Sequence, residues 1–241
     1  MTRLVLLPGL DGTGELFASF IAALRGLPTQ VIAYPPDRPM NYAAHEQHAR
    51  PQLPHDEDYV LLAESFSGPV GISIAASAPP RLKGLVLCAS FAANPLPLLG
   101  PLSRLIGILP AARVPVALTE PWLYAGRGTP ELRRAHAAAM SRVSAKVLRA
   151  RVAAVLAVDH RELLARIAVP MLYLRASKDR LIPASAASAI LQARPDMKIV
   201  EIEAPHFLLQ TEPRKCAVAI MNFLSSAHEA DAKLAPIPNT F

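Results

Sequence analysis

Residues 59–68 read Tyr-Val-Leu-Leu-Ala-Glu-Ser-Phe-Ser-Gly, a short apolar run followed directly by a turn. The run YVLLA is typical of a strand buried on both faces of a sheet. The stretch that follows, SGPVGISIAASA at 67–78, has the length and composition of a buried helix. A sharp turn from strand to helix needs small residues two positions before and after its centre, and Ala63 and Ser67 supply them. The turn therefore predicts that the Ser65 hydroxyl projects from the carboxyl edge of a sheet.

Short apolar runs alternate with helical patterns along much of the chain. The runs predict six strands, at 3–7, 30–34, 59–63, 84–88, 171–175 and 198–203. Apolar residues at helical spacing predict helices between the strands, at 15–25, 67–78, 184–193 and 213–226. Strands that alternate with helices favour an α/β fold, in which helices flank a mainly parallel sheet of about six strands.

One long stretch interrupts this alternation. Residues 93–167 contain no good strand pattern, and 130–157 within them look helical. We therefore expect two core segments, 1–92 and 168–228, separated by a helical lid at 93–167 that covers one end of the sheet. Residues 229–241 are expected to form a loosely attached tail.

Composition limits the classes of protein to consider. The chain has 241 residues, of which 52% are hydrophobic and 18% charged, which suits one compact domain with a sizeable core. The net charge of +6 is concentrated in residues 99–166, which hold eleven Lys and Arg against four Asp and Glu. A basic surface can bind nucleic acid, but aromatic residues at only 5% and the lack of a recognisable binding motif argue against that partner. Cys88 and Cys216 are expected to be buried small hydrophobes and not a disulfide framework.

Two segments bear on the location of the protein. The apolar run in the first residues, MTRLVLL, is too short before Pro8 to be a secretory signal. Residues 84–103 carry no charge, but prolines and glycines interrupt them, so we expect no integral membrane segment. The sequence thus predicts a cytoplasmic protein.

Ser65 needs a base and an acid to act as a nucleophile, and both residue types follow predicted strands. His206 comes directly after the run 198–203 and so is expected at the same carboxyl edge as Ser65. Asp179 follows the run 171–175, and a carboxylate there can fix the tautomer of a histidine and stabilise its charged form. We therefore assign Ser65 as nucleophile, His206 as general base and Asp179 as the residue that orients His206.

Other residues of these types are weaker candidates. Ser67 lies one step into the predicted helix, and neither Asp159 nor Asp196 follows a strand. The remaining histidines fall in predicted helices or polar loops, where solvated surface positions are expected: His45, His48, His55, His136, His160 and His228.

A glycine-rich loop, LPGLDGTG at 7–14, leaves the first strand beside the expected position of Ser65. The backbone N–H groups of Leu10 and Phe66 could hold the negative charge that develops on a carbonyl oxygen. Phe66 also lies at a helix N-terminus, where partial positive charge favours an anion. The loop matches neither G-x-x-x-x-G-K-[ST] nor G-x-G-x-x-G, so a phosphate-binding role is not expected.

Four segments resemble the α/β-hydrolase superfamily, in particular its compact esterase-like members such as carboxylesterases and pimeloyl-carrier-protein methyl ester esterases. They are LPGLDGTG (7–14), AESFSG (63–68), SKDRLIP (177–183) and PHFLLQTEP (205–213). The order of serine, aspartate and histidine along the chain is also that of the superfamily. The resemblance implies a serine hydrolase that needs no metal or organic cofactor. Two departures affect loops: Pro8 replaces the usual histidine before the oxyanion glycine, and Pro205 replaces the usual glycine before the catalytic histidine.

The predicted lid bears on the substrate. Residues 95–125 are rich in Leu, Ile, Val and Pro and include Trp122 and Tyr124, which with Phe207 are expected to line a pocket for an apolar acyl or alkyl chain. We expect hydrolysis of a small-molecule carboxylic ester through an acyl-enzyme on Ser65. The arginines of the lid could also attract an acidic or carrier-protein-linked substrate. Thioester, lactone and C–C bond hydrolysis and perhydrolysis remain open, as does a non-catalytic binding protein of the same fold.

Overall fold

The structure is a computed structural model that describes residues 2–98 and 116–234. Its six strands form one sheet in the order β2-β1-β3-β4-β5-β6, and all neighbouring strands are parallel. The strands are β1 (Arg3–Leu7), β2 (Thr29–Val31), β3 (Tyr59–Glu64), β4 (Leu82–Cys88), β5 (Met171–Ala176) and β6 (Lys198–Ile202). The predicted α/β fold class is confirmed.

The strand order places a switch point between β1 and β3. The chain first runs outward from β1 to β2 and then returns past β1 to form β3, so the segments leaving β1 and β3 diverge at the carboxyl edge of the sheet. Ligands of open parallel sheets bind at such a point. The loop 7–14 follows β1 and Ser65 follows β3, so both lie there.

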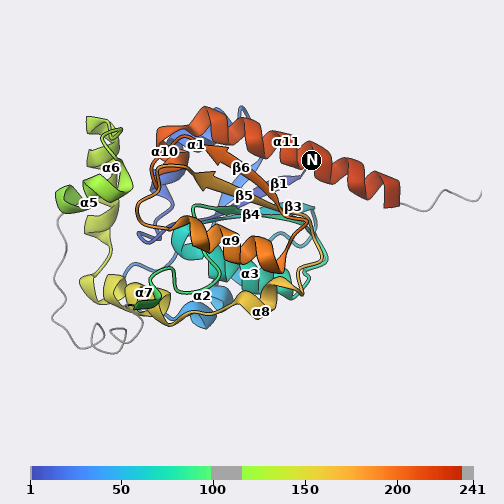
Figure 1. Cartoon of the computed structure of the whole chain (residues 1–241), viewed down its shortest axis with the longest axis horizontal. Helices are drawn as coiled ribbons and strands as arrows, with labels where there is room; N and C mark the ends of the chain where they lie inside the picture. The colour runs from blue at the N-terminus through green and yellow to red at the C-terminus, as the bar shows by residue number, and fades with distance from the viewer. Residues whose placement is uncertain (1, 99–115, 235–241) are drawn as a thin grey trace, which may run out of the picture.

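Two layers of helices cover the faces of the sheet (Figure 1). One face carries α1 (Ala18–Ala23), α10 (Leu208–Thr211) and α11 (Pro213–Leu234), and the other carries α2 (Tyr42–Ala49), α3 (Gly68–Ala76), α8 (Arg161–Leu164) and α9 (Ala184–Ala193). Each face has its own buried hydrophobic cluster, as expected for strands that are apolar on both sides. Helix α11 continues to Leu234, past its predicted end at 226 and into the predicted tail. No helix among the described residues is long and apolar enough to cross a membrane.

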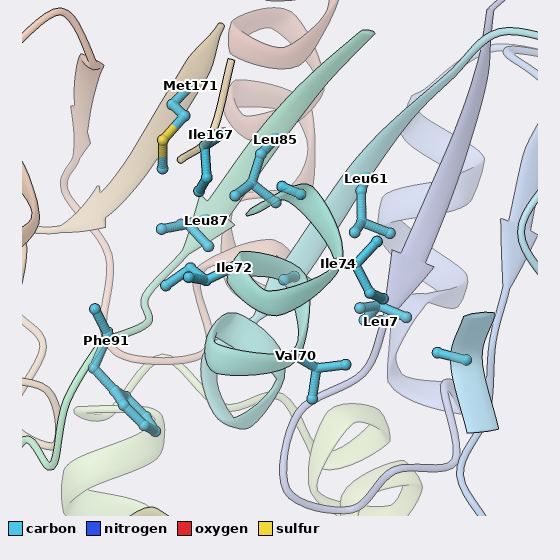
Figure 2. Close-up of a cluster of buried hydrophobic side chains, with 14 of the residues drawn as sticks. Leu7, Leu61, Val70, Ile72, Ile74, Leu85, Leu87, Phe91, Ile167 and Met171 are labelled. Carbon is cyan, nitrogen blue, oxygen red and sulfur yellow. The ribbon is translucent and has the colours of Figure 1, made fainter. Parts of the chain in front are cut away.

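Helix α3 forms the centre of one cluster. Figure 2 shows Val70, Ile72 and Ile74 of this helix among side chains from β1, β3 and β4, and all three are fully buried. The helix is apolar around most of its circumference, which is typical of a helix with no solvated face. The packing of α3 in the core therefore fixes the segment that directly follows Ser65.

Close packing between α3 and the sheet depends on Gly71. A Cβ at this position would lie 2.8 Å from the Ala63 Cβ and 3.2 Å from the Leu85 Cδ1. Alanine favours a helix interior by about 1 kcal/mol over glycine, but an overpacked core loses about 1–3 kcal/mol. We expect Gly71→Ala to lower the free energy of unfolding, measured as a lower urea midpoint. An unchanged or higher midpoint would contradict this packing.

The described part of the predicted lid contains α5 (Val116–Leu123), α6 (Pro130–Arg142) and α7 (Ala145–Ala157), followed by the short helix α8. The helical pattern at 130–157 is divided because Val143 is extended and the Ser144 side chain accepts a hydrogen bond from the Val147 N–H, which starts a new helix. In Figure 1, α5 and α6 lie beyond the end of the sheet to which the strand arrows point. Residues 99–115 of the predicted lid fall outside the described residues.

The two ends of this insertion meet. Ala93 and Asp159 form an isolated antiparallel bridge, the Asn94 N–H donates to the Val158 carbonyl at 2.9 Å, and the His160 N–H donates to the Ala92 carbonyl at 2.8 Å. Helix α8, which the prediction placed in the lid, packs instead against α3 and α9 of the core. Residues 93–159, whose ends these contacts join, are called the insertion below, and the lid bounds of 93–167 stay a prediction.

Candidate active site

Ser65 occupies the turn between β3 and α3, and its backbone is strained. Its φ of 46° lies in the left-handed region, which residues other than glycine rarely adopt. A short 3₁₀ turn, η3 (Ser65–Ser67), links the strand to the helix. The Ser90 hydroxyl, which follows β4, donates to the Ser65 carbonyl at 2.5 Å. A strained serine between strand and helix is the geometry of a nucleophile elbow.

The structure brings Ser65, His206 and Asp179 together from the ends of three strands. The Ser65 Oγ lies 2.9 Å from the His206 Nε2, and the His206 Nδ1 lies 2.8 Å from the Asp179 Oδ2. The side chains of His206 and Asp179 are only 3% and 6% exposed. Because the Asp179 Oδ1 accepts the N–H groups of Leu181 and Ile182 at 2.8 and 2.9 Å, its carboxylate has a fixed orientation.

The rival residues have other partners. Ser67 is fully buried, its hydroxyl donates to the Pro8 carbonyl, and its Oγ lies 2.7 Å from the Tyr34 hydroxyl. Asp159 pairs with Arg161 at 2.5 Å, and Asp196 pairs with Arg194 at 2.6 Å. None of the three carries the contacts that Ser65 and Asp179 make with His206.

The surface position predicted for the other histidines is wrong for two of them. His45 is 1% exposed, and burial lowers its pKa to about 4. Its Nδ1 lies 2.8 Å from the Asn41 carbonyl. His136 is 4% exposed, and its Nδ1 lies 2.7 Å from the Tyr124 hydroxyl. The helix that carries His45, α2, was not predicted, because its sequence YAAHEQHA has no apolar stripe and its start depends on the Asn41 cap.

The proposed oxyanion donors come from adjacent segments. Leu7 and Ala63 are partners in the β1–β3 register, so Leu10 and Phe66 follow neighbouring strands at the same edge. The Gly12 N–H donates to the Gly9 carbonyl at 3.0 Å and closes a turn around Leu10. The Phe66 side chain is buried among other rings. Its ring centroid lies 5.1 Å from that of Tyr42, 5.0 Å from that of His45 and 6.2 Å from that of Tyr34.

Solved structures share this architecture. A hydrolase from Pseudomonas aeruginosa is 23% identical with a TM-score of 0.76, and the alignment covers 92% of this chain and 89% of that one. A lipase-esterase related protein from Clostridium acetobutylicum is 13% identical with a TM-score of 0.77, and the alignment covers 92% of this chain and 94% of that one. An enol-lactonase from Burkholderia xenovorans is 16% identical with a TM-score of 0.74, and the alignment covers 93% of this chain and 91% of that one. The chain has the α/β-hydrolase fold. No protein-family model matches the sequence, and no curated protein matches it.

In this α/β-hydrolase fold a further acidic residue, Glu64, lies directly before Ser65, and its sequence pattern was not recognised as part of the site. It is 6% exposed, its Oε1 accepts the Gln210 amide at 2.9 Å, and it also accepts the Gly9 N–H. Burial, with a smaller contribution from the Asp11 charge, raises the pKa of Glu64 to about 7. A charged residue at the end of an otherwise apolar strand was the signal that could have indicated it.

Replacing Glu64 with glutamine should remove a pH dependence of stability. The folded state keeps the Glu64 proton up to a pKa of about 7, whereas a glutamate in the unfolded chain loses its proton near its ordinary pKa of 4.5, so stability falls as pH rises through this range. Glutamine mimics the protonated carboxyl, and Gln210 can rotate its amide to pair with it. At pH 8 we expect Glu64→Gln to unfold with a free energy up to about 3 kcal/mol higher than wild type. At pH 4 the two should be equal.

Urea unfolding at both pH values measures this difference. Glu57→Gln is a matched control, since Glu57 pairs with Arg3 at 2.5 Å in a partly exposed ion pair and should change stability by less than about 1 kcal/mol. An equal difference from wild type at pH 4 and pH 8 would show that Glu64 titrates normally.

Two of the three predicted pocket residues pack together. Tyr124 is fully buried and its ring lies 5.2 Å from that of Phe207, while the Phe207 N–H donates to the Leu123 carbonyl at 3.1 Å. Trp122 is 49% exposed. The insertion therefore contacts the loop that carries His206 through Tyr124, with Trp122 facing solvent.

Most arginines in the described part of the insertion have acidic or backbone partners. Arg127 pairs with Glu203 at 2.9 Å and with Glu212 at 3.0 Å, and Arg134 pairs with Glu131 at 3.0 Å. Further pairs join Arg133 with Glu120 and Arg142 with Glu15. This pairing reduces the positive charge available to an acidic or carrier-protein-linked substrate. Within the described residues, no group of three or more His, Cys, Asp and Glu side chains is placed to hold a metal ion.

Proposed function

We propose that this protein is a serine hydrolase that cleaves carboxylic esters with an apolar acyl or alkyl part. The observation that carries the proposal is the chain of contacts from the Ser65 Oγ through His206 to Asp179, built on a strained turn at Ser65. A nucleophile hydrogen-bonded to a base, which is in turn oriented by a third group, is the arrangement of nucleophilic catalysis.

The geometry supports acyl transfer in two steps. The Ser65 Oγ attacks the ester carbonyl as its proton passes to the His206 Nε2, and the N–H groups of Leu10 and Phe66 hold the resulting oxyanion. His206 then protonates the leaving alcohol, and an acyl-enzyme remains on Ser65. Water, deprotonated by His206, attacks this acyl group and releases the acid. Asp179 accepts the His206 Nδ1–H throughout.

The similar structures agree with hydrolysis, and their titles include a lipase-esterase related protein and an enol-lactonase. Lactone opening uses the same steps, with the alcohol remaining attached to the acid, so it is the second candidate reaction. Phe207 supplies partly exposed apolar surface beside His206, and the buried Tyr124 ring packs against it. That surface favours an apolar substrate over a carrier-protein-linked one, because the arginines of the insertion are largely paired.

Hydrolysis of p-nitrophenyl esters from acetate to palmitate tests the proposal, together with labelling by a fluorophosphonate and location of the label by mass spectrometry. We expect turnover with a preference for one chain length and a label on Ser65. A label on Ser65 without ester turnover would support the serine hydrolase and reject simple esters as substrates. A protein that neither turns over any ester nor reacts with the probe would contradict the proposal.

A further inference from the structure

A single arginine of the insertion holds the loop between β1 and the first helix. The Arg151 Nη1 donates to the Leu10 carbonyl at 2.8 Å and to the Asp11 carbonyl at 2.7 Å. The Gly9 carbonyl is already occupied by the Gly12 N–H at 3.0 Å. All three carbonyls from Gly9 to Asp11 are therefore held, which fixes the peptide planes around the Leu10 N–H.

The same guanidinium also contacts the second proposed oxyanion segment. Its Cζ lies 6.0 Å from the centroid of the Phe66 ring and 5.7 Å from that of Tyr34, within the range of a cation–π contact. Its Nη2 donates to the Pro35 carbonyl at 3.2 Å. Arg151 thus touches both Leu10 and Phe66, the two residues whose N–H groups are proposed to hold the oxyanion.

Arg151 is fully buried, which is unusual for a charged side chain. Burial lowers the pKa of Arg151, whereas the nearby Asp11 raises it. A buried cation is costly unless its partners replace water, and an apolar side chain could fill the same space without that cost. The contacts with backbone carbonyls therefore indicate that Arg151 does more than fill space in the core.

The loop is shaped to admit this guanidinium. Gly12 has a φ of 69°, and a Cβ there would lie 2.4 Å from the Arg151 Nη1. A residue with a side chain at this position would be strained and would displace Arg151. The loop and the insertion therefore fit each other at this point, although Leu10 and Arg151 are 141 positions apart in the sequence.

We propose that Arg151 is a positioning residue for the oxyanion hole, which keeps the Leu10 N–H directed at the developing oxyanion and makes the rate of acyl transfer depend on the insertion. This inference rests on the proposed function. Removal of a direct oxyanion donor lowers kcat about 10²- to 10³-fold. Since Arg151 acts through the loop, we expect Arg151→Met to lower kcat about 10- to 100-fold with KM changed little.

Three measurements on Arg151→Met separate positioning from general damage. They are the kcat and KM for the best p-nitrophenyl ester, the inhibition constant of a trifluoromethyl ketone that mimics the tetrahedral intermediate, and the rate of fluorophosphonate labelling of Ser65. We expect kcat, the labelling rate and ketone affinity to fall by a similar factor. Arg142→Met is the matched control, because Arg142 lies on α6 in an exposed ion pair with Glu15 and should leave all three unchanged.

Added guanidinium ion at millimolar concentration should restore part of the labelling rate in Arg151→Ala, and urea at the same concentration should not. If Arg151→Met does not fold, Arg151→Lys decides, because one ammonium cannot match the guanidinium contacts with three carbonyls. Full activity in folded Arg151→Met or Arg151→Lys would overturn the inference while leaving the serine hydrolase intact. Absence of labelling in the wild-type protein would instead overturn the proposed function, and this inference with it.

Discussion

Replacing Ser65 with alanine should lower kcat about 10⁴- to 10⁶-fold on any ester that the wild-type protein cleaves. The variant loses the oxygen that lies 2.9 Å from the His206 Nε2 and that would form the acyl-enzyme. Fluorophosphonate labelling should disappear. The fold should persist, because the Ser65 side chain is not part of the hydrophobic core. The backbone strain at a φ of 46° should be similar for alanine and serine.

Ser67→Ala provides the matched control for Ser65→Ala. The Ser67 hydroxyl is buried against the Tyr34 hydroxyl and the Pro8 carbonyl, so its loss should cost stability of about 1–3 kcal/mol. Ser65 should still take the label in this variant. A label that moves from Ser65 to Ser67, or turnover that survives in Ser65→Ala, would reject Ser65 as the nucleophile.

Asp179→Asn should have the second-largest effect, a loss of about 10⁴ in kcat. Asparagine can present its NH₂ group to the His206 Nδ1, at the position where the Asp179 Oδ2 now lies at 2.8 Å. The histidine would then carry its proton on Nε2 and could no longer accept the proton of Ser65. KM should change little, because the hydrogen bonds of Asp179 go to His206 and to the backbone N–H groups of Leu181 and Ile182.

The kinetic loss in Asp179→Asn is compared with that in Asp196→Asn. Asp196 follows a helix and pairs with Arg194, and this variant should keep wild-type kcat. Folding of both variants is checked by circular dichroism and urea unfolding. An Asp179→Asn protein that is folded and retains more than a tenth of the wild-type kcat would show that another residue orients His206.

The parts of the fold that the sequence predicted are those whose signal lies in consecutive residues. The apolar run before Ser65 and the small residues around it indicate a buried strand and a tight turn, and the structure has both. Asp179 and His206 could be proposed as partners of Ser65 because each follows such a run, and the structure places the three side chains in contact. The strand predicted at 30–34 is observed at Thr29–Val31, since Ile32 still donates to Leu6 of β1 but the Tyr34 N–H turns to the Gly12 carbonyl.

What the sequence could not show depends on contacts between distant residues. Arg151 resembles Arg149, the other arginine of α7, and only the folded chain shows that Arg151 is buried against Leu10 and Asp11. His45 looks polar in a polar segment, yet the rings of Tyr34 and Phe66 enclose it. The unusual pKa of Glu64 likewise comes from burial beside Gln210, a residue 146 positions away.

The bridge between Ala93 and Asp159 has a consequence for how such a protein can diversify. Because the two ends of the insertion lie side by side outside the sheet, a recombination event could exchange this segment without altering the strand order. The segment would not be fully interchangeable, since a replacement without a cation to meet the carbonyls of Leu10 and Asp11 would leave them unpaired. A new insertion that changes the substrate preference would therefore also have to supply such a cation. One segment of the gene would then affect both the specificity and the catalytic rate.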